Sequence, residues 1–266
     1  MPQFTPVSKT LRAAFLPIAK HNLRTSFRAV RLANATRLRK EDAPLVVTLN
    51  HASWWDPLAC MVLSTSLMPT RNHYAPMETT ALDRFPFFRK LGVFPLEPGT
   101  PRGAAHFLRT AQQIVLDRKN VLWLTPQGRF ADARLRPAGF ANGIGALLAR
   151  KRELTLQPIA FEYVFWNQRL PELLINIGAP LFVTPSDRHT TQEWTALAEA
   201  ATVATQDELK ELALTRDPAP FTTLLEGTSG TGGVYGILQR LRGKHLSADH
   251  PGGPPGPAGP AGPASK

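Results

Sequence analysis

Short apolar runs and amphipathic stretches alternate along residues 35–214 of the chain. The runs at Leu45–Leu49 and Val121–Leu124 are continuously apolar, which predicts strands that are buried on both faces. Further strands are predicted at Ala35–Arg39, Val93–Leu96, Leu154–Val164 and Leu173–Ile177, with a short one near Tyr74. Helices are predicted at Leu58–Leu67, Pro101–Arg118, Ala141–Lys151 and residues 190–214. This alternation predicts an α/β fold, with a mostly parallel or mixed central sheet flanked by helices.

Residues 8–32 show a helical period instead. An apolar stripe is formed by Leu23, Phe27 and Val30, at spacings of four and three. A basic stripe with matching spacings is formed by Lys20, Arg24, Arg28 and Arg31. The pattern predicts one amphipathic helix, or two with a break near Pro17. We assign residues 1–34 to a basic amphipathic helical arm, which can lie in a membrane interface, pack on its own domain, or do both.

The distribution of charge supports a role for this arm. The chain of 266 residues has a net charge of +11, from 31 basic and 20 acidic residues. The first 40 residues hold 9 of the basic residues and no acidic one. Charge concentrated at one end favours contact with an anionic membrane surface, and argues against binding to nucleic acid.

The remaining composition bounds the location and the domains. No apolar run reaches roughly 18 residues, so no transmembrane helix is expected, and we expect peripheral association with the cytoplasmic face of the cell membrane. The single cysteine, Cys60, excludes an internal disulfide, which fits a reducing compartment. Residues 35–245 form the predicted main domain. Residues 246–266 form a Pro/Gly/Ala tail that we predict to be disordered, after a short helix at Val234–Leu241.

Polar segments follow several of the predicted strands. Asn50-His51 follows Leu45–Leu49, and the segments Glu97–Arg102 and Pro126–Arg129 follow two others. Because ligands bind at the carboxyl ends of strands in such sheets, we expect the three segments to converge. Asp56 lies five residues after His51, so a bend can place its carboxylate on one imidazole nitrogen. This is the arrangement of a general base, although spacing alone is more typical of a structural pair.

The chain resembles the PlsC-like glycerophospholipid (lysophospholipid) acyltransferase family in five ordered blocks between residues 35 and 185. The first block corresponds to the segment from Asn50 to Pro57, which reads Asn-His-x-x-x-x-Asp-Pro. The later blocks correspond to Leu91-Gly92-Val93-Phe94, Pro126-Gln127-Gly128, Phe140-Ala141-Asn142-Gly143 and Gln157-Pro158-Ile159.

This resemblance implies transfer of a fatty acyl group from acyl-CoA or acyl carrier protein to a lipid hydroxyl. His51 would be the general base and Asp56 would orient it, with no metal and no cofactor. Pro158 and Trp54 are the candidates for the acyl or donor site, although Trp54 could equally pack in the core. The candidates for binding the acceptor or its phosphate are Arg102, Gln127, Gly128, Arg129 and Arg134.

The chain departs from the family pattern where the acceptor is expected to bind. The second block lacks the usual Arg after its Phe, because Pro95-Leu96-Glu97-Pro98 stands there. In the third block Gln127 replaces the usual Glu, and Arg129 follows Gly128 directly. A 1-acylglycerol-3-phosphate acceptor is therefore one reading. The alternatives are another acceptor, such as a glycolipid, a carotenoid glycoside or an amino-acid lipid, or a thioesterase or non-catalytic lipid-binding protein. No Gly-x-Ser-x-Gly nucleophile motif is present, which counts against a hydrolase.

Overall fold

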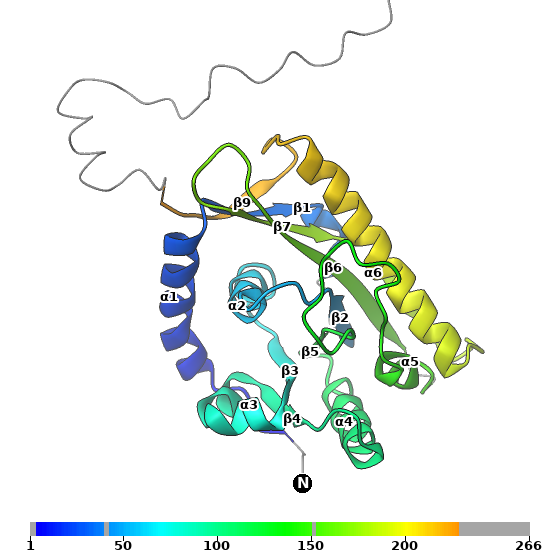
Figure 1. Cartoon of the computed structure of the whole chain (residues 1–266). Coiled ribbons are helices and arrows are strands. Elements are labelled where there is room, and N and C mark those ends of the chain that lie inside the picture. Colours follow the sequence, from blue (N-terminus) through cyan, green and yellow to red (C-terminus); the bar gives the residue numbers. More distant parts are fainter. Residues whose placement is uncertain (1–3, 40–42, 151–152, 229–266) are drawn as a thin grey trace, which may run out of the picture.

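A computed structural model describes residues 4–39, 43–150 and 153–228. Within them the strands form a mixed sheet in the order β4-β3-β5-β2-β6-β7-β1-β9, with β8 paired to β6 (Figure 1). The strands are β1 (Ala29–Ala33), β2 (Leu45–Leu49), β3 (Asn72–Glu78), β4 (Val93–Leu96), β5 (Asn120–Leu124), β6 (Leu154–Val164), β7 (Glu172–Ile177), β8 (Leu181–Val183) and β9 (Thr222–Glu226). Strands β4, β3, β5, β2 and β6 run parallel, so their carboxyl ends share one edge.

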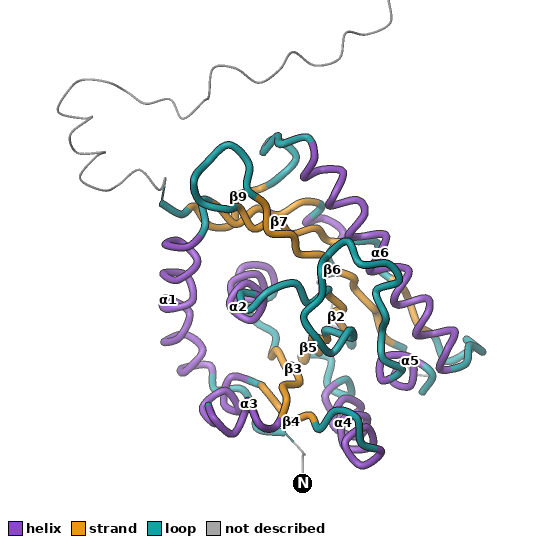
Figure 2. The backbone as a smooth tube through the Cα atoms, in the orientation of Figure 1, coloured by secondary structure: helices purple, strands orange, loops and turns teal. Residues whose placement is uncertain are grey.

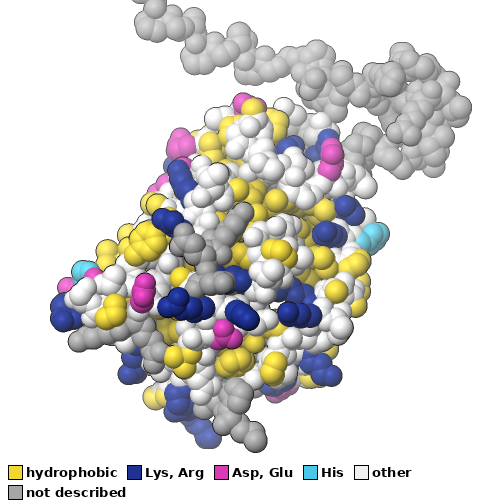
Figure 3. Space-filling model, turned by 180° about the vertical axis from the view of Figure 1, so that it is seen from behind, with side chains coloured by type: hydrophobic (Ala, Val, Ile, Leu, Met, Phe, Trp, Pro, Cys, Tyr) yellow, Lys and Arg dark blue, Asp and Glu magenta, His cyan; other side chains and the backbone are white. Residues whose placement is uncertain are grey.

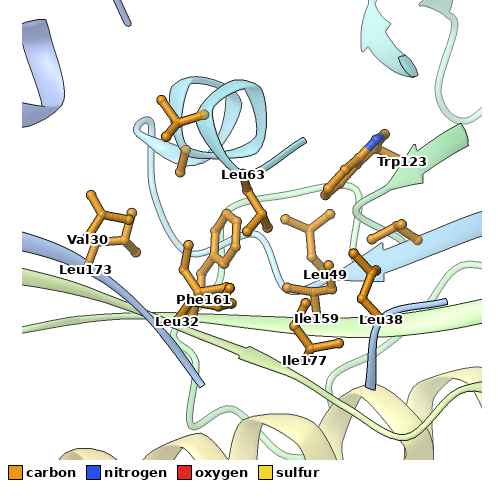
Figure 4. Packing of buried hydrophobic residues seen from close by; sticks show 14 of the residues in the cluster. Val30, Leu32, Leu38, Leu49, Leu63, Trp123, Ile159, Phe161, Leu173 and Ile177 are labelled. Carbon is orange, nitrogen blue, oxygen red and sulfur yellow. The ribbon is translucent and has the colours of Figure 1, made fainter. Parts of the chain in front are cut away.

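Helices cover both faces of this sheet (Figure 1). They are α1 (Lys9–Ser26), α2 (Asp56–Leu67), α3 (Thr79–Arg84), α4 (Pro101–Ile114), α5 (Gly143–Leu148) and α6 (Thr191–Leu214), with short 3₁₀ turns η1 (Ala35–Arg37) and η2 (Pro86–Leu91). Helix α2 packs over β2 and β6 through Leu63, Phe161 and Ile159 (Figure 4). Helix α6 packs on the opposite face, where Leu209 contacts the cluster around Ala160. The predicted α/β fold is therefore confirmed.

Local sequence explains where the helices near the strand ends begin. Asp56 opens α2 and Pro57 follows at the position where a proline is pre-organised for a helix. The Thr100 hydroxyl accepts a hydrogen bond from the Gly103 amide and caps α4. Thr190 and Glu193 form a reciprocal capping box at the start of α6.

The arm is the part of the fold that differs from the prediction. Helix α1 is continuous through Pro17 but ends at Ser26, and residues 29–33 form strand β1 between β7 and β9 instead of extending the helix. Val30 and Leu32 are both buried in the sheet, and this tertiary burial outweighs the helical spacing of Leu23, Phe27 and Val30.

Two further differences concern the segments that flank the sheet. The strand predicted at Ala35–Arg39 is the 3₁₀ turn η1, because Asn34 adopts a left-handed conformation at φ 55° and turns the chain away from β1. The helix predicted at Pro101–Arg118 ends at Ile114, and the one at Ala141–Lys151 spans Gly143–Leu148. The predicted helix at Val234–Leu241 and the tail at 246–266 lie outside the described residues.

The basic residues of the arm region are partly used inside the fold. Arg12 donates to the hydroxyls of Ser64 and Thr65 on α2, at 2.7 and 3.0 Å. Arg28 pairs with Glu226, and Arg31 pairs with Glu172. Seen from behind, Lys and Arg side chains are scattered over the surface with Asp and Glu among them (Figure 3). Part of the positive charge at the N-terminal end is therefore paired within the fold.

Candidate active site

The end of β2 is tied to β6 by the side chain of Asn50. Its amide nitrogen donates to the Phe161 carbonyl at 2.9 Å, and its amide oxygen accepts from the Phe161 N–H at 2.8 Å. Asn50 is only 1% exposed, so water does not compete for these bonds. The two bonds fix the point at which the chain leaves the sheet, and hence the position of His51.

His51 and Asp56 are brought together by the turn that joins β2 to α2. The distance between His51 Nδ1 and Asp56 Oδ2 is 2.7 Å. The Asp56 side chain is 3% exposed and the His51 side chain 23% exposed. One group of the pair is thus shielded from water while the other reaches the surface of the site.

Asp56 accepts two further hydrogen bonds that hold its carboxylate in place. The Ser53 N–H donates to Oδ2 at 3.1 Å, and the Tyr163 hydroxyl donates to Oδ1 at 2.6 Å. Burial, with the negative charge of Asp56, raises the pKa of Tyr163, so this hydroxyl stays protonated and remains a donor. Burial and Asp56 likewise raise the pKa of Cys60, which keeps that thiol protonated and unreactive.

These contacts define what His51 can do chemically. Asp56 accepts a hydrogen bond from Nδ1–H, so the lone pair of the neutral ring lies on Nε2. Nε2 has no hydrogen-bond partner among the described residues. It is therefore free to take a proton from a bound hydroxyl, and Asp56 would stabilise the resulting imidazolium.

The loop after β5 forms the second wall of the site and passes across the ends of β2 and β6 towards α6 (Figure 2). The Gln127 side chain accepts the His51 backbone N–H at 2.9 Å and donates to the Ala138 carbonyl at 3.3 Å. Farther along the loop, the Ala131 N–H donates to the His51 carbonyl at 2.9 Å. The Phe130 ring lies 4.3 Å from the His51 ring, between centroids. Two predicted segments, Asn50-His51 and Pro126–Arg129, therefore converge.

Comparison with known proteins agrees with this geometry. The family model described as Acyltransferase matches residues 29–162, just over half of the 266 residues. The chain belongs to the acyltransferase family. The family predicted from the five blocks is thereby confirmed, and the chain is an acyltransferase enzyme.

The fold of the acyltransferase is also found in a solved structure. The crystal structure of PlsC, the 1-acyl-sn-glycerophosphate (LPA) acyltransferase from Thermotoga maritima, matches with a TM-score of 0.52 and 14% sequence identity. The match covers 76% of this chain and 79% of that one. A search of curated proteins finds no match. At this identity the PlsC structure shows a shared fold.

The predicted acceptor residues of the acyltransferase have different surroundings. Gly128 has a φ of 64° and its surroundings are open, so its backbone conformation, rather than space, requires glycine. Arg129 is exposed next to Phe130. Arg134 is bound by Asp132 through two bonds of 2.8 Å. Arg102 lies at the start of α4, the next element after β4. In the sheet, β4 is separated from β2 by β3 and β5.

The separation of Arg102 from His51 can be sized from the sheet. Three strand spacings of about 4.8 Å place β4 roughly 14 Å from β2. Arg102 makes no contact with His51 or Asp56 among the described residues. The segment Glu97–Arg102 thus lies at the expected edge of the sheet but three strands from Asn50-His51. It does not converge with the other two segments as expected.

The two candidates for the acyl or donor site also lie apart. Trp54 is 73% exposed on the turn between His51 and Asp56 and packs only its edge against Trp55. Pro158 is buried within β6, opposite Thr48, and faces the side of Gly178. Trp54 therefore borders the site, whereas Pro158 lies inside the sheet.

Sequence reasoning missed the roles of three residues that shape the site. Asn50 was predicted to belong to the polar segment but not to bridge two strands. Tyr163 lies two residues after Phe161 and four after Ile159, so all three side chains point towards α2. This alternation was the one feature of the sequence that could have placed Tyr163 near Asp56. Phe130 has no such signal.

Proposed function

We propose that this acyltransferase moves a fatty acyl group from an acyl thioester, acyl-CoA or acyl carrier protein, to the hydroxyl of a lipid acceptor. His51 is the general base and Asp56 orients it. The observation that carries the proposal is the 2.7 Å bond between His51 Nδ1 and Asp56 Oδ2, which leaves Nε2 unpartnered at the carboxyl edge of the sheet.

The reaction proceeds without an acyl-enzyme. His51 Nε2 takes the proton of the acceptor hydroxyl as its oxygen bonds to the thioester carbonyl carbon. The tetrahedral intermediate then collapses, the C–S bond breaks, and the imidazolium returns the proton to the departing sulfur. The products are a lipid ester and a free thiol, and no metal or redox cofactor takes part. General base catalysis of this kind contributes about 10²–10⁴ in rate.

Backbone N–H groups of the third-block loop are candidates to stabilise the oxyanion. The Gly128 N–H is occupied, because it donates to the Thr125 carbonyl at 3.0 Å. The N–H groups of Arg129 and Phe130 have no partner among the described residues. A donor aimed at a developing oxyanion is worth about 10²–10³ in rate. We assign this part to Arg129 and Phe130.

Exposed aromatic side chains around this edge support work at a membrane surface. Trp54 follows β2, Phe130 follows β5 and Phe165 follows β6, and they are 73%, 58% and 67% exposed. Since β2, β5 and β6 are parallel, all three residues lie at the edge that carries His51. Aromatic side chains are favoured at the membrane–water interface, so this edge can face the bilayer and receive lipid directly.

The arm packs on its own domain and keeps basic residues for contact with a membrane surface. Ala19 and Leu23 of α1 are buried against the domain, so its apolar stripe is already covered. Lys9, Lys20 and Arg24 have no ion-pair partner among the described residues and remain to attract anionic lipid. No helix in the described part of the chain is long and apolar enough to cross a membrane. We propose a peripheral enzyme on the cytoplasmic face.

The decisive experiment supplies every lipid acceptor at once. The purified protein is incubated with radiolabelled acyl-CoA and a total lipid extract of its source, and the labelled product is identified by mass spectrometry. The proposal predicts a new acylated lipid that Asp56→Asn forms at most at about one-hundredth of the rate. Release of labelled free fatty acid at one rate with and without lipid would show a thioesterase instead.

A further inference from the structure

A polar cavity lies between the loop after β5 and α6, on the face of the sheet that α6 covers. Its volume is about 180 Å³. The polar side chains that line it are Arg134, Arg136, Glu162, Gln206, Asp207 and Lys210. Glu162 faces α6 because it is two residues beyond Ala160, which packs on Leu209 of that helix.

Two short connections link this cavity to the candidate base. Phe161 lines the cavity, and its backbone is bonded to Asn50, the residue before His51. Ala133 also lines it and is two residues from Ala131, whose N–H donates to the His51 carbonyl. Two residues of chain span at most about 7 Å, so the cavity lies beside the loop that contacts the His51 backbone. It opens on the α6 face of the sheet, whereas Tyr163 lies on the α2 face, so a headgroup in the cavity would reach His51 around the carboxyl edge of the sheet.

The cavity contains hydrogen-bond acceptors that lack donors. Gln206 is 4% exposed; its Nε2 donates to the Ala133 carbonyl at 2.8 Å, while its Oε1 is buried without any partner. The half-buried Glu162 carboxylate makes no hydrogen bond or ion pair with a described residue. Burial raises the pKa of Glu162, and the charge of Arg134 opposes that rise. A buried acceptor without a donor is costly, so Gln206 favours a ligand that brings donors, and the half-buried Glu162 carboxylate can accept from the same ligand.

The cations of the cavity are already engaged. Arg134 is bound by Asp132, and Arg136 pairs with Asp207 at 2.7 Å. Lys210 lies 3.1 Å from Glu211. A phosphate would have to displace these carboxylates, and it would approach Glu162 with the same sign of charge. The chemistry therefore favours a neutral group with many hydroxyls.

We propose that the cavity binds an uncharged, hydroxyl-rich headgroup of the acceptor lipid, that is, a sugar or polyol. This rests on the proposed acyl transfer and names the class of acceptor. Ligand hydroxyls donate to Gln206 Oε1 and to Glu162. The cavity has room for several water molecules and hence for one sugar-sized group. The absence of an Arg in the second block and the distance to Arg102 agree with an acceptor that has no phosphate.

Kinetics with two acceptors test this assignment. A monohexosyl diacylglycerol and a lysophosphatidic acid are presented separately in neutral vesicles, with labelled acyl-CoA. Wild type should use the hexosyl lipid with a kcat/KM at least about tenfold higher. Glu162→Leu should raise the KM for the hexosyl lipid about tenfold, the effect of one lost hydrogen bond to a charged group, with little change in kcat.

The matched control is Glu153→Leu, which makes the same substitution at an exposed position just before β6, at the other end of the strand. It should keep the wild-type KM. Preference of wild type for lysophosphatidic acid, or an unchanged KM in Glu162→Leu, would overturn the assignment while leaving acyl transfer established. Failure of every lipid to become acylated would instead reject the proposed function.

A direct binding measurement decides the headgroup separately from turnover. Octyl β-D-glucoside below its micelle concentration and glycerol 3-phosphate are titrated into the full chain by calorimetry. The glucoside should bind at least about tenfold more tightly, and Glu162→Leu should abolish that preference. Equal or tighter binding of glycerol 3-phosphate would overturn the proposal. A crystal soaked with the glucoside whose cavity holds only water would overturn it as well.

Discussion

Replacing Tyr163 with Phe removes one hydroxyl and tests how firmly Asp56 must be held. Among the described residues three hydrogen bonds reach the Asp56 carboxylate, and the one from Tyr163 is the shortest, at 2.6 Å, and the only one to Oδ1. Asp56 is 3% exposed, so water cannot replace the lost donor. A hydrogen bond to a charged group contributes about 1.5–3 kcal/mol. We therefore expect a loss of that size in the free energy of unfolding, or about 3–12 °C in Tm.

The same substitution should slow turnover. With Oδ1 released, the carboxylate can rotate, and His51 spends less time with Nε2 aimed at the acceptor. We expect kcat to fall about tenfold, which corresponds to about 1.4 kcal/mol, with both KM values near those of wild type because Tyr163 does not contact substrate in the proposed mechanism. Steady-state acylation with labelled acyl-CoA measures kcat and KM, and differential scanning calorimetry measures Tm.

Tyr74→Phe is the matched control. Tyr74 is also buried, at 4% exposed, but lies on β3 against Phe4. It should change stability and leave kcat unaltered. If Tyr163→Phe kept both the wild-type kcat and the wild-type Tm, the bond from Tyr163 to Asp56 would contribute nothing, and the account of how the pair is held would be refuted.

Four further outcomes follow from the same geometry. Gln127→Glu keeps an acceptor for the His51 backbone N–H and should retain kcat within about threefold, whereas Gln127→Ala should lose about tenfold in the same assay. Gly128→Ala should lower the free energy of unfolding by about 1–2 kcal/mol in urea titrations, because φ is positive there. Trp54→Ala should weaken binding to vesicles in a sedimentation assay without reducing kcat on acceptor dispersed in detergent. Because the pKa of Tyr163 is raised by folding, the unfolded chain loses this proton near pH 10 while the folded chain keeps it. The free energy of unfolding of wild type should therefore fall above about pH 10, by up to about 1.4 kcal/mol per pH unit more than that of Tyr163→Phe. Denaturant titrations at several pH values measure the difference.

Apolar runs with clear limits predicted the sheet most accurately. Leu45–Leu49, Val93–Leu96 and Leu154–Val164 are strands with the predicted bounds. The first two are short, apolar and followed by a polar residue, whereas Leu154–Val164 is a longer run rich in apolar residues. Strand β1 was missed because Val30 continues the helical spacing of Leu23 and Phe27. Only its partners β7 and β9, which lie far away in the sequence, make that segment a strand.

The candidate site likewise contains one contact that the sequence could predict and others that it could not. His51 and Asp56 are five residues apart, and the turn between them is local, so spacing predicted their contact. Tyr163 is 107 residues from Asp56, and a single sequence contains no information on a contact over that distance. Arg134 lies close behind the third block and pairs with its neighbour Asp132 at the surface, and its role in binding the acceptor stays a prediction.

The central claim is that His51 removes the proton of the acceptor hydroxyl. The most direct measurement is the single-turnover rate of acyl transfer to the labelled lipid identified from the extract, for wild type, His51→Ala and His21→Ala. His21 is an exposed histidine on α1 and controls for loss of an imidazole elsewhere. We predict a fall of about 10²–10⁴ for His51→Ala, with an unaltered circular dichroism spectrum, and the wild-type rate for His21→Ala. A rate for folded His51→Ala equal to that of wild type would contradict the account.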